Sequence, residues 1–407
     1  MTGADKKDVT KRKRMVAGAF SGTNLALAGG HNQRATLQAI RVKSPITRLE
    51  LAEMTGLTAP AIANITKKLL ADGLIAEVGR VRGGRGQPAK MLAINPDGCY
   101  SIGVNIDRDH ITIVMLDLLG RVRARTTREV DFALPAAVTK LFRNEIDYFF
   151  NKVGIPKEKV IGIGVALPDD MGKVELPKQP NSYSVWSDTD VEALFTRIID
   201  LPTYVENDAT AAAIGEMQFG LGLQHSSFFY ILVTWGLGGG VVVDEVYYRG
   251  ATGRSGEIGF LPVARGASSK RSLQDVVSLS ALYEYLGERG YDISSPSDID
   301  ALQPDIRPAL ETWAESAAEH LVEPVIAVNC LINPGAVLIG GRLPAAVADA
   351  LTEKLDAKLR AQATGVPALS PVKRAAIAED APAVGAAILP FSDMLFPTRT
   401  ALLKSTG

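Results

Sequence analysis

Hydrophobic residues recur at helical spacing near the front of the chain, over residues 32–43 and again over residues 46–70. Gly56 interrupts the second stretch where two short helices would meet, and Thr58 can cap the second of these helices. Two short apolar runs follow, at residues 74–79 and 90–94, around a Gly/Arg-rich loop. The pattern predicts a winged helix-turn-helix whose first helix is capped by Asn32.

From residue 96 onward, strand-like and helix-like apolar runs form a pattern that occurs twice. The duplicated order β-β-β-α-β-α is the layout of the actin/hexokinase fold. We therefore expect an α/β protein, with a winged helix-turn-helix head followed by a two-lobed actin/hexokinase-like (ribonuclease H-like) ATPase-fold body. The expected strands are 100–107, 111–117, 122–130, 161–166, 204–207, 228–234, 240–247 and 336–339; the expected helices are 135–153, 191–199, 271–290, 308–333, 344–361 and 382–395.

These elements indicate the domain organisation. We expect a basic, partly disordered arm over residues 1–30 and the DNA-binding domain over residues 31–95. Residues 96–207 plus 381–407 would form the first lobe, and residues 208–380 the second. Pro390 should kink or break the last helix.

Charge separates the head from the body. Residues 1–95 carry 16 Lys/Arg and 6 Asp/Glu, a net charge of +10, whereas the whole chain carries 44 and 45. A basic head on an acidic body indicates a polyanionic partner for the head. No uncharged apolar run approaches the length of a membrane span, and the basic N-terminus is not followed by an apolar segment. We expect a cytoplasmic protein without a membrane partner.

Three polar or glycine-rich segments fall together between residues 205 and 260. They read Asn207-Asp208-Ala209, then Thr234-Trp235-Gly236-Leu237-Gly238-Gly239-Gly240, then Gly256-Glu257-Ile258-Gly259-Phe260. Together they resemble the ROK family of sugar kinases and sugar-responsive repressors, whose pattern includes Asn-Asp-Ala, a glycine-rich turn and a Gly-Glu-x-Gly-His loop. The resemblance covers nearly the whole chain, including the front domain.

The resemblance implies a sugar site formed by Asn207, Asp208 and Glu257, with Gln274 at a position where the family has Glu. In family kinases the Asp is the general base, so Asp208 is the candidate if the protein is a kinase. Otherwise Asp208 accepts a hydrogen bond from a sugar hydroxyl, and Asn207, which can donate and accept hydrogen bonds, suits a vicinal diol. An Asx cap of the following helix is a second, compatible reading of Asn207.

Other segments depart from the family's kinases. The family's Asp-x-Gly-Gly-Thr reads Asn105-Ile106-Asp107-Arg108-Asp109, which places carboxylates where a phosphate would lie, and Trp235 crowds the second glycine turn. Phe260 replaces the His that contacts sugar and ligates zinc, and residues 263–273 contain no cysteine. We therefore expect no catalytic residues, no metal ligands, no zinc and no ATP as a cofactor.

The front domain would bind double-stranded DNA. Residues 58–70 form the expected recognition helix, with Thr58 as its cap, and Asn64 and Lys67 face outward toward the major groove. The wing arginines would lie along the minor groove; they are Arg80, Arg82 and Arg85. A winged helix used for protein contacts is the alternative.

The sequence thus predicts a DNA-binding transcription regulator, a repressor, with a small carbohydrate effector and a degenerate, non-catalytic kinase body. The partners would be a DNA operator and further copies of the chain, as a homodimer or homotetramer. One alternative is an active ATP-dependent sugar kinase with a DNA-binding head. Another is a regulator that has lost its sugar ligand and answers to a protein partner.

Overall fold

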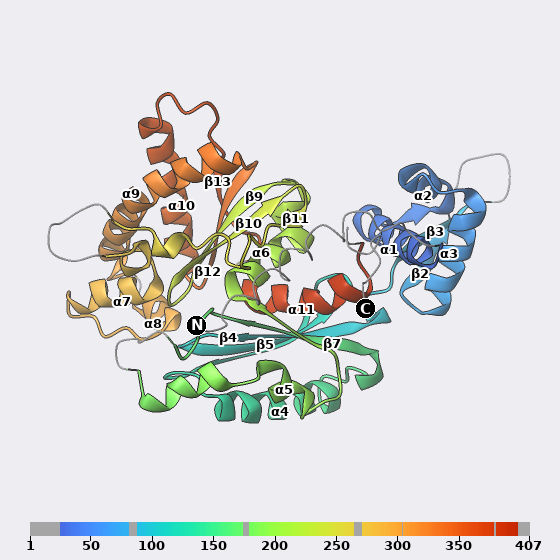
Figure 1. Ribbon diagram of the computed structural model, residues 1–407, viewed down its shortest axis with the longest axis horizontal. Helices are drawn as coiled ribbons and strands as arrows, with labels where there is room; N and C mark the ends of the chain where they lie inside the picture. Colours follow the sequence, from blue (N-terminus) through green and yellow to red (C-terminus); the bar gives the residue numbers. More distant parts are fainter. Residues whose placement is uncertain are drawn as a thin grey trace, which may run out of the picture. The chain divides into compact units, whose positions relative to one another are not determined.

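The computed structural model describes residues 25–80, 88–173, 179–263, 271–302, 304–377 and 380–397. The chain forms two compact units: a smaller one comprising Met1–Cys99, Asp117–Leu119 and Phe391–Gly407, and a larger one comprising Tyr100–Leu116 and Gly120–Pro390 (Figure 1). The predicted head ended at residue 95, and residues 381–407 were expected in the first lobe. In the described part of the chain, no helix has both the length and the apolar character that crossing a bilayer requires.

The smaller unit contains the expected winged helix-turn-helix. Its three strands form a sheet in the order β1-β3-β2, with antiparallel neighbours. The first helix begins at Leu25 rather than at Asn32, so part of the segment assigned to the arm is helical. The elements are α1 (Leu25–Lys43), β1 (Ile46–Thr47), α2 (Arg48–Thr55), α3 (Ala59–Ala71), β2 (Ile75–Arg80) and β3 (Lys90–Ile94).

Local capping sets the ends of the two short helices. Thr47 and Glu50 form a capping box at the start of α2, with reciprocal side-chain to backbone hydrogen bonds. Gly56 ends α2 at φ 70°, a left-handed conformation that a side chain would disfavour. Thr58 caps α3 by accepting a hydrogen bond from the N–H of Ala61, as the sequence predicts.

In the first lobe, a five-stranded sheet has the order β6-β5-β4-β7-β8. Helices α4 and α5 cover one face of this sheet (Figure 1). The rings of Phe142 in α4 and Phe195 in α5 pack edge to face, with their centroids 4.8 Å apart. The elements of the first lobe are β4 (Tyr100–Ile106), β5 (His110–Asp117), β6 (Val122–Glu129), α4 (Pro135–Asn151), β7 (Val160–Leu167), α5 (Val191–Thr196) and β8 (Thr203–Asn207).

The second lobe repeats this plan with a sheet in the order β11-β10-β9-β12-β13. The predicted helix over residues 271–290 is shorter than expected, because only its second half is helical. The elements are α6 (Asp208–Phe219), β9 (Phe228–Val233), β10 (Leu237–Val243), β11 (Val246–Tyr247), α7 (Leu279–Gly287), α8 (Pro296–Ala301), α9 (Arg307–Ile332), β12 (Ala336–Gly341), α10 (Ala345–Gln362) and β13 (Val372–Arg374). The last helix, α11 (Ala381–Met394), packs against β4 and β7 of the first lobe.

Helices α6 and α11 contact each other through very small residues. A Cβ added to Gly385 of α11 would lie 1.7 Å from the carbonyl oxygen of Ala211 in α6, and one added to Gly103 of β4 would lie 1.9 Å from the carbonyl oxygen of Ala383. Helix α6 is buried over its first nine residues, which is expected of a helix without a polar face. Close backbone contact therefore fixes the helix that begins with Asp208.

The glycine run has a different role from the predicted turn. The turn is Thr234-Trp235-Gly236, and the three following glycines lie inside β10. A Cβ on Gly238 would lie 2.9 Å from Cβ of Ala209, and one on Gly240 would lie 2.6 Å from Cβ of Ala213. These glycines let α6 pack directly on the strand.

The last helix is not broken at Pro390, where the sequence predicted a kink or a break. Helix α11 runs from Ala381 to Met394 with Pro390 inside it. The preceding residues are packed against small groups: a Cβ on Gly164 would lie 1.8 Å from the carbonyl oxygen of Ala386. The strand that contains Gly164 therefore packs directly on the helix just before the proline.

Candidate functional site

A cavity of about 1450 Å³ lies between the two lobes of the body. All four side chains that the sequence analysis assigned to a ligand line it. Asn207 ends β8 and Asp208 begins α6, whereas Glu257 precedes the single turn Ile258–Phe260 and Gln274 lies in the turn Leu273–Asp275. The fold thus brings together groups from three places in the chain.

Asn207 has one side-chain atom committed to the helix. Its Oδ1 accepts hydrogen bonds from the backbone N–H of Thr210, at 3.0 Å, and from the Thr210 hydroxyl, at 3.3 Å. The Asx cap that the sequence left as a compatible reading is therefore present. The amide Nδ2 is the atom with which Asn207 can donate to a ligand.

Asp208 lines the cavity and is 8% exposed. Its Oδ1 accepts a hydrogen bond from the N–H of Ala209 at 2.8 Å. Burial, reinforced by the negative charge of Asp107, raises the pKa of Asp208 to about 7. A buried carboxyl group of this kind needs hydrogen-bond donors, and ligand hydroxyls can supply them.

Glu257 is tied to the opposite lobe through Arg254. The Nε of Arg254 lies 2.9 Å from Oε1 of Glu257, and its Nη1 lies 2.5 Å from Oδ2 of Asp170. Asp169 is 3.7 Å away, and burial raises the pKa of its carboxyl group, whereas the hydrogen bond from Arg254 lowers the pKa of Asp170. Because these groups are partly exposed, each pair stabilises the fold by at most about 1 kcal/mol.

Aromatic rings supply apolar surface within the cavity. Phe132, Trp235 and Phe260 all line it, and Phe260 is 58% exposed. Trp235 packs edge-on against Tyr283, with ring centroids 6.4 Å apart, and its carbonyl accepts a hydrogen bond from Ser280 at 2.8 Å. A few polar groups set among aromatic ones are typical of a small-molecule site.

The hairpin between β4 and β5 is bound to the second lobe by Arg342. Nη1 of Arg342 donates to Oδ2 of Asp109 at 2.9 Å, and Nη2 contacts Glu129. Oδ1 of Asp109 lies 2.7 Å from Nδ1 of His110, whose Nε2 lies 3.0 Å from Nδ2 of Asn105. These residues include replacements of the family's Asp-x-Gly-Gly-Thr motif, so the departures form one connected network.

Burial and charge compete at this network. Burial alone would raise the pKa of Asp109, but the hydrogen bond from His110 and the charge of Arg342 hold that pKa below its usual range. Ligand atoms of Asp107, Asp109 and His110 lie within 4.8 Å of one another, which is close enough to hold a metal ion. Both oxygens of Asp109 already have protein partners, so a metal would have to displace them.

The absence of a zinc site stays a prediction. It rests on residues 263–273, of which 264–270 lie outside the described residues. Gln274, at the family's Glu position, lines the cavity beside Gly236: a Cβ on that glycine would lie 3.5 Å from Oε1 of Gln274.

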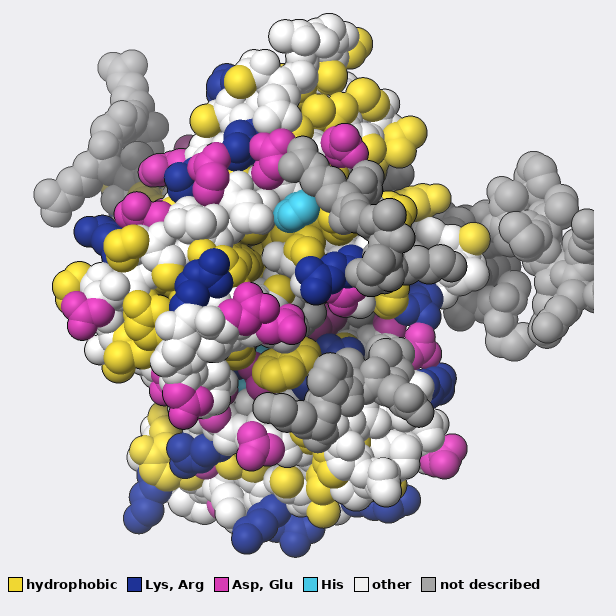
Figure 2. Space-filling model, turned by 90° about the vertical axis from the view of Figure 1, so that its left-hand side faces the viewer, with side chains coloured by type: hydrophobic (Ala, Val, Ile, Leu, Met, Phe, Trp, Pro, Cys, Tyr) yellow, Lys and Arg dark blue, Asp and Glu magenta, His cyan; other side chains and the backbone are white. Residues whose placement is uncertain are grey.

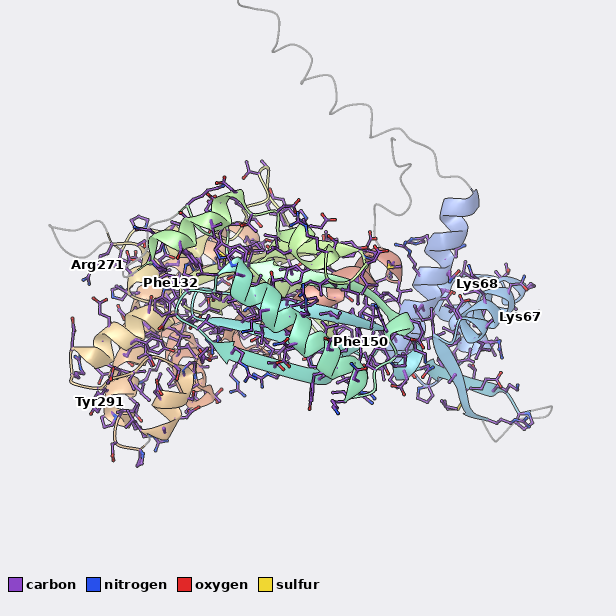
Figure 3. All side chains as sticks on the ribbon, turned by 90° about the horizontal axis from the view of Figure 1, so that it is seen from below. Lys67, Lys68, Phe132, Phe150, Arg271 and Tyr291 are labelled. Atoms are coloured by element: carbon purple, nitrogen blue, oxygen red, sulfur yellow. The ribbon has the colours of Figure 1, made fainter. Side chains whose placement is uncertain are left out.

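In the head, the outward side of α3 carries polar and basic groups. Asn64 and Lys67 are exposed, as the sequence predicts, and Figure 3 shows Lys67 and Lys68 at the surface of the head. Arg48 is held by Thr66, at 2.9 Å, and by Glu77, at 3.8 Å. This arginine therefore supports α3 from the side.

The wing is described only at its base. Arg80 is exposed at the end of β2, whereas Arg82 and Arg85 lie outside the described residues. Thr58, the remaining predicted DNA contact, is exposed and caps α3. The contact of each with DNA stays a prediction.

Sequence reasoning missed two arginines of the body, Arg254 and Arg342. Each reaches across the cleft to a carboxylate far away in the chain, 84 and 233 residues from it respectively. No local pattern marks such pairs. In the sequence, each of these arginines is marked only by a preceding glycine, in Gly253-Arg254 and Gly341-Arg342.

Comparison with known proteins assigns a family to each of the two parts of the chain. Residues 101–392 match the ROK family, and residues 31–76 match a winged helix-turn-helix DNA-binding domain. The chain is 30% identical over 233 residues to the xylose repressor of Bacillus subtilis; the aligned region covers 57% of this chain and 60% of the repressor. It is 26% identical over 351 residues to the Escherichia coli transcriptional dual regulator NagC, covering 79% and 82% of the two chains. A solved ROK family transcriptional regulator, a homologue of the E. coli MLC protein, has a TM-score of 0.69 at 24% identity, covering 91% and 98%. The protein is therefore a member of the ROK family with an N-terminal winged helix-turn-helix.

Proposed function

We propose that this protein is a DNA-binding transcription regulator, acting as a repressor, whose body binds a small carbohydrate and does not phosphorylate it. One observation carries the proposal. Asn207, Asp208 and Glu257 line the cavity with groups suited to hydroxyls, while the Arg342–Asp109 ion pair occupies the hairpin that kinases of the family use for phosphates.

The sugar side of the cavity has complementary hydrogen-bonding capacity. Asp208 accepts, and Nδ2 of Asn207 donates, so two adjacent hydroxyls can be read together. Trp235 and Phe260 offer apolar surface to the carbon skeleton of the sugar. Burial of Asp208 is unfavourable without a partner, so a donating ligand gains affinity there.

Phosphoryl transfer is disfavoured by the same cleft. Asp107 is 1% exposed, and its Oδ1 accepts a hydrogen bond from the backbone N–H of Arg108. Its Oδ2 has no hydrogen-bond partner among the described residues, so it adds negative charge beneath the hairpin. Asp109 is already neutralised by Arg342. A triphosphate would have to approach both carboxylates and displace an ion pair that is about nine-tenths buried.

The ion pairs across the cleft couple ligand binding to lobe angle. Arg254 joins Glu257 to Asp170, so a ligand that competes for Glu257 also changes a contact between the lobes. A ligand that favours one lobe angle over another shifts the population toward that angle. We infer that this shift alters DNA binding by the heads of an even-numbered oligomer.

DNA binding rests on the head. The exposed Asn64 and Lys67 lie on the side of α3 that would enter the major groove, where an amide can read adenine and an ammonium can contact guanine or phosphate. Removing the wing arginines with Arg82→Ala and Arg85→Ala should weaken binding strongly. The gel-shift control is Lys152→Ala with Lys157→Ala, which removes the same charge from the body; equal affinity of both double variants would remove the wing from the model of binding.

An activity assay separates the regulator from a kinase. We expect no ATP-dependent phosphorylation of hexoses or pentoses by the full chain, while a thermal shift reports binding of one of these sugars. Asp208→Asn is the matched variant, because it keeps the shape and removes the base. ATP turnover with a sugar that disappears in Asp208→Asn would place the protein among the sugar kinases.

Phe260 favours a second candidate, a regulator that answers to a protein partner. It is 58% exposed and its neighbour Leu261 is 42% exposed, where the family pattern has a sugar-binding His at position 260. Under this alternative no sugar changes DNA binding, and Phe260→Ser abolishes regulation in cells while leaving DNA affinity in vitro unchanged. A sugar response that survives Phe260→Ser contradicts it.

A further inference from the structure

The cavity between the lobes has a strong excess of negative charge. The described residues that line it include nine Asp and Glu side chains but only two arginines, Arg108 and Arg254. Neither lysine nor histidine occurs among the described lining residues. On the face seen in Figure 2, acidic and basic side chains are interspersed with apolar ones.

Both arginines are already paired with protein carboxylates. Arg254 contacts Asp170 at 2.5 Å and Glu257 at 2.9 Å. Arg108 lies 3.8 Å from Asp107, which is 1% exposed. A phosphate entering the cavity would have to take an arginine from its carboxylate and leave that carboxylate unpaired, which is a large electrostatic cost.

Of the other lining carboxylates, Asp109 and Glu129 are paired with Arg342, and Asp169 lies 3.7 Å from Arg254. No ion pair with a described residue involves the remaining four, which are Asp131, Asp208, Asp275 and Glu284. Asp208 accepts one backbone hydrogen bond and faces the cavity, while Asp131 and Glu284 are exposed on its walls. In a partly enclosed space such charges repel an anion and attract a cation more strongly than on an open surface. Hydroxyl and ammonium groups, in contrast, can donate to each of them.

We propose that the effector is an uncharged or positively charged polyol, that is, a free sugar or an amino sugar, and that the cavity discriminates against sugar phosphates and sugar acids. The inference rests on the carbohydrate-binding function proposed above and names the chemical class of the ligand. Discrimination arises from repulsion by the unpaired carboxylates and from the absence of an unshared basic group among the described lining residues.

Calorimetric titration of the full chain tests this with matched ligands. The panel comprises glucose, mannose, galactose and xylose, the phosphate ester of each, and the 2-amino derivatives of the hexoses. We expect one free sugar to bind, its amino form to bind at least as tightly, and its phosphate ester to bind at least tenfold more weakly. Added salt should reduce the difference in binding affinity between the free sugar and its phosphate ester.

Charge variants identify the cause. Asp131→Asn combined with Glu284→Gln should improve binding of the ester relative to the free sugar by several-fold, whereas Glu158→Gln, an exposed carboxylate outside the cavity, should not. An ester that binds as tightly as its free sugar, and loses binding in Asp208→Ala, overturns this inference and leaves the proposed function standing. Binding of no compound in the panel would refute both.

Discussion

Asp208 makes the stability of the body depend on pH in a direction that can be tested. Its pKa is raised from 3.8 to about 7, mainly by burial and then by Asp107. The folded state therefore holds the proton more tightly than the unfolded state. The stability that this provides is complete below about pH 4 and is lost as pH rises through about 7.

The magnitude follows from the two pKa values. A difference of about three pKa units corresponds to about 4 kcal/mol, which is an upper bound for a buried group whose surroundings can relax. Asn has nearly the shape of the protonated carboxyl group and does not titrate. We expect Asp208→Asn to match the wild type near pH 4 and to exceed its free energy of unfolding by about 2–4 kcal/mol at pH 8.

Urea denaturation followed by tryptophan fluorescence measures this difference. The chain has three tryptophans, Trp186, Trp235 and Trp313, all in the body, so the signal reports the unit that contains Asp208. Asp131→Asn, an exposed carboxylate on the same cavity, is the control and should follow the wild type. Parallel curves for Asp208→Asn and the wild type from pH 5 to pH 8 would refute the reasoning.

Three further perturbations follow from the contacts. Gly385→Ala places a Cβ 1.7 Å from a backbone oxygen and should lower the free energy of unfolding by at least about 3 kcal/mol or prevent folding. The control is Gly287→Ala, whose Cβ has no atom within 4 Å and which should leave stability unchanged. Equal denaturation midpoints for the two variants would contradict the packing argument. Arg342→Gln and Asp109→Asn should each lower the free energy of unfolding by about 3 kcal/mol, because removing one partner leaves a buried charge. The double variant should lose much less than the sum of the two single losses, and additive losses would show that the pair does not couple the lobes. Lys67→Ala should weaken binding to all DNA sequences to a similar degree and reduce the salt dependence of the DNA affinity by about one released counterion. Fluorescence anisotropy over a salt series measures both effects. A loss of affinity confined to one DNA sequence would indicate that Lys67 contacts a base.

The local pattern predicted most of the elements, because caps and apolar periodicity act over a few residues. Thr58 and Gly56 set the helix-turn-helix as expected, and the strand before Asp208 ends where the polar residues begin. The glycines of β10 were assigned to a turn, since a glycine run does not reveal whether the chain bends or another helix packs on it. The contact with Ala209 that decides the matter comes from the fold.

Long-range charge pairs explain what else could not be predicted. The network of Arg342, Asp109 and His110 joins residues from two lobes, and the sequence supplied only the separate departures from a motif. The sequence placed Asn207 and Asp208 near Glu257 through a family resemblance, and the structure puts all three around one cavity. The pairing of Glu257 with Arg254 became visible only in the structure.

The central claim, that a carbohydrate held by Asp208 controls DNA binding, is tested by one titration. Fluorescence anisotropy would measure the affinity of the full chain for a DNA sequence selected from a random pool, with and without the sugar that binds the body. We predict that the sugar changes the affinity of the wild type at least tenfold and leaves the affinity of Asp208→Ala unchanged, with equal affinities of the two proteins when sugar is absent. The same sugar-dependent change in both proteins, or in neither while the sugar still binds the wild type, would contradict the account.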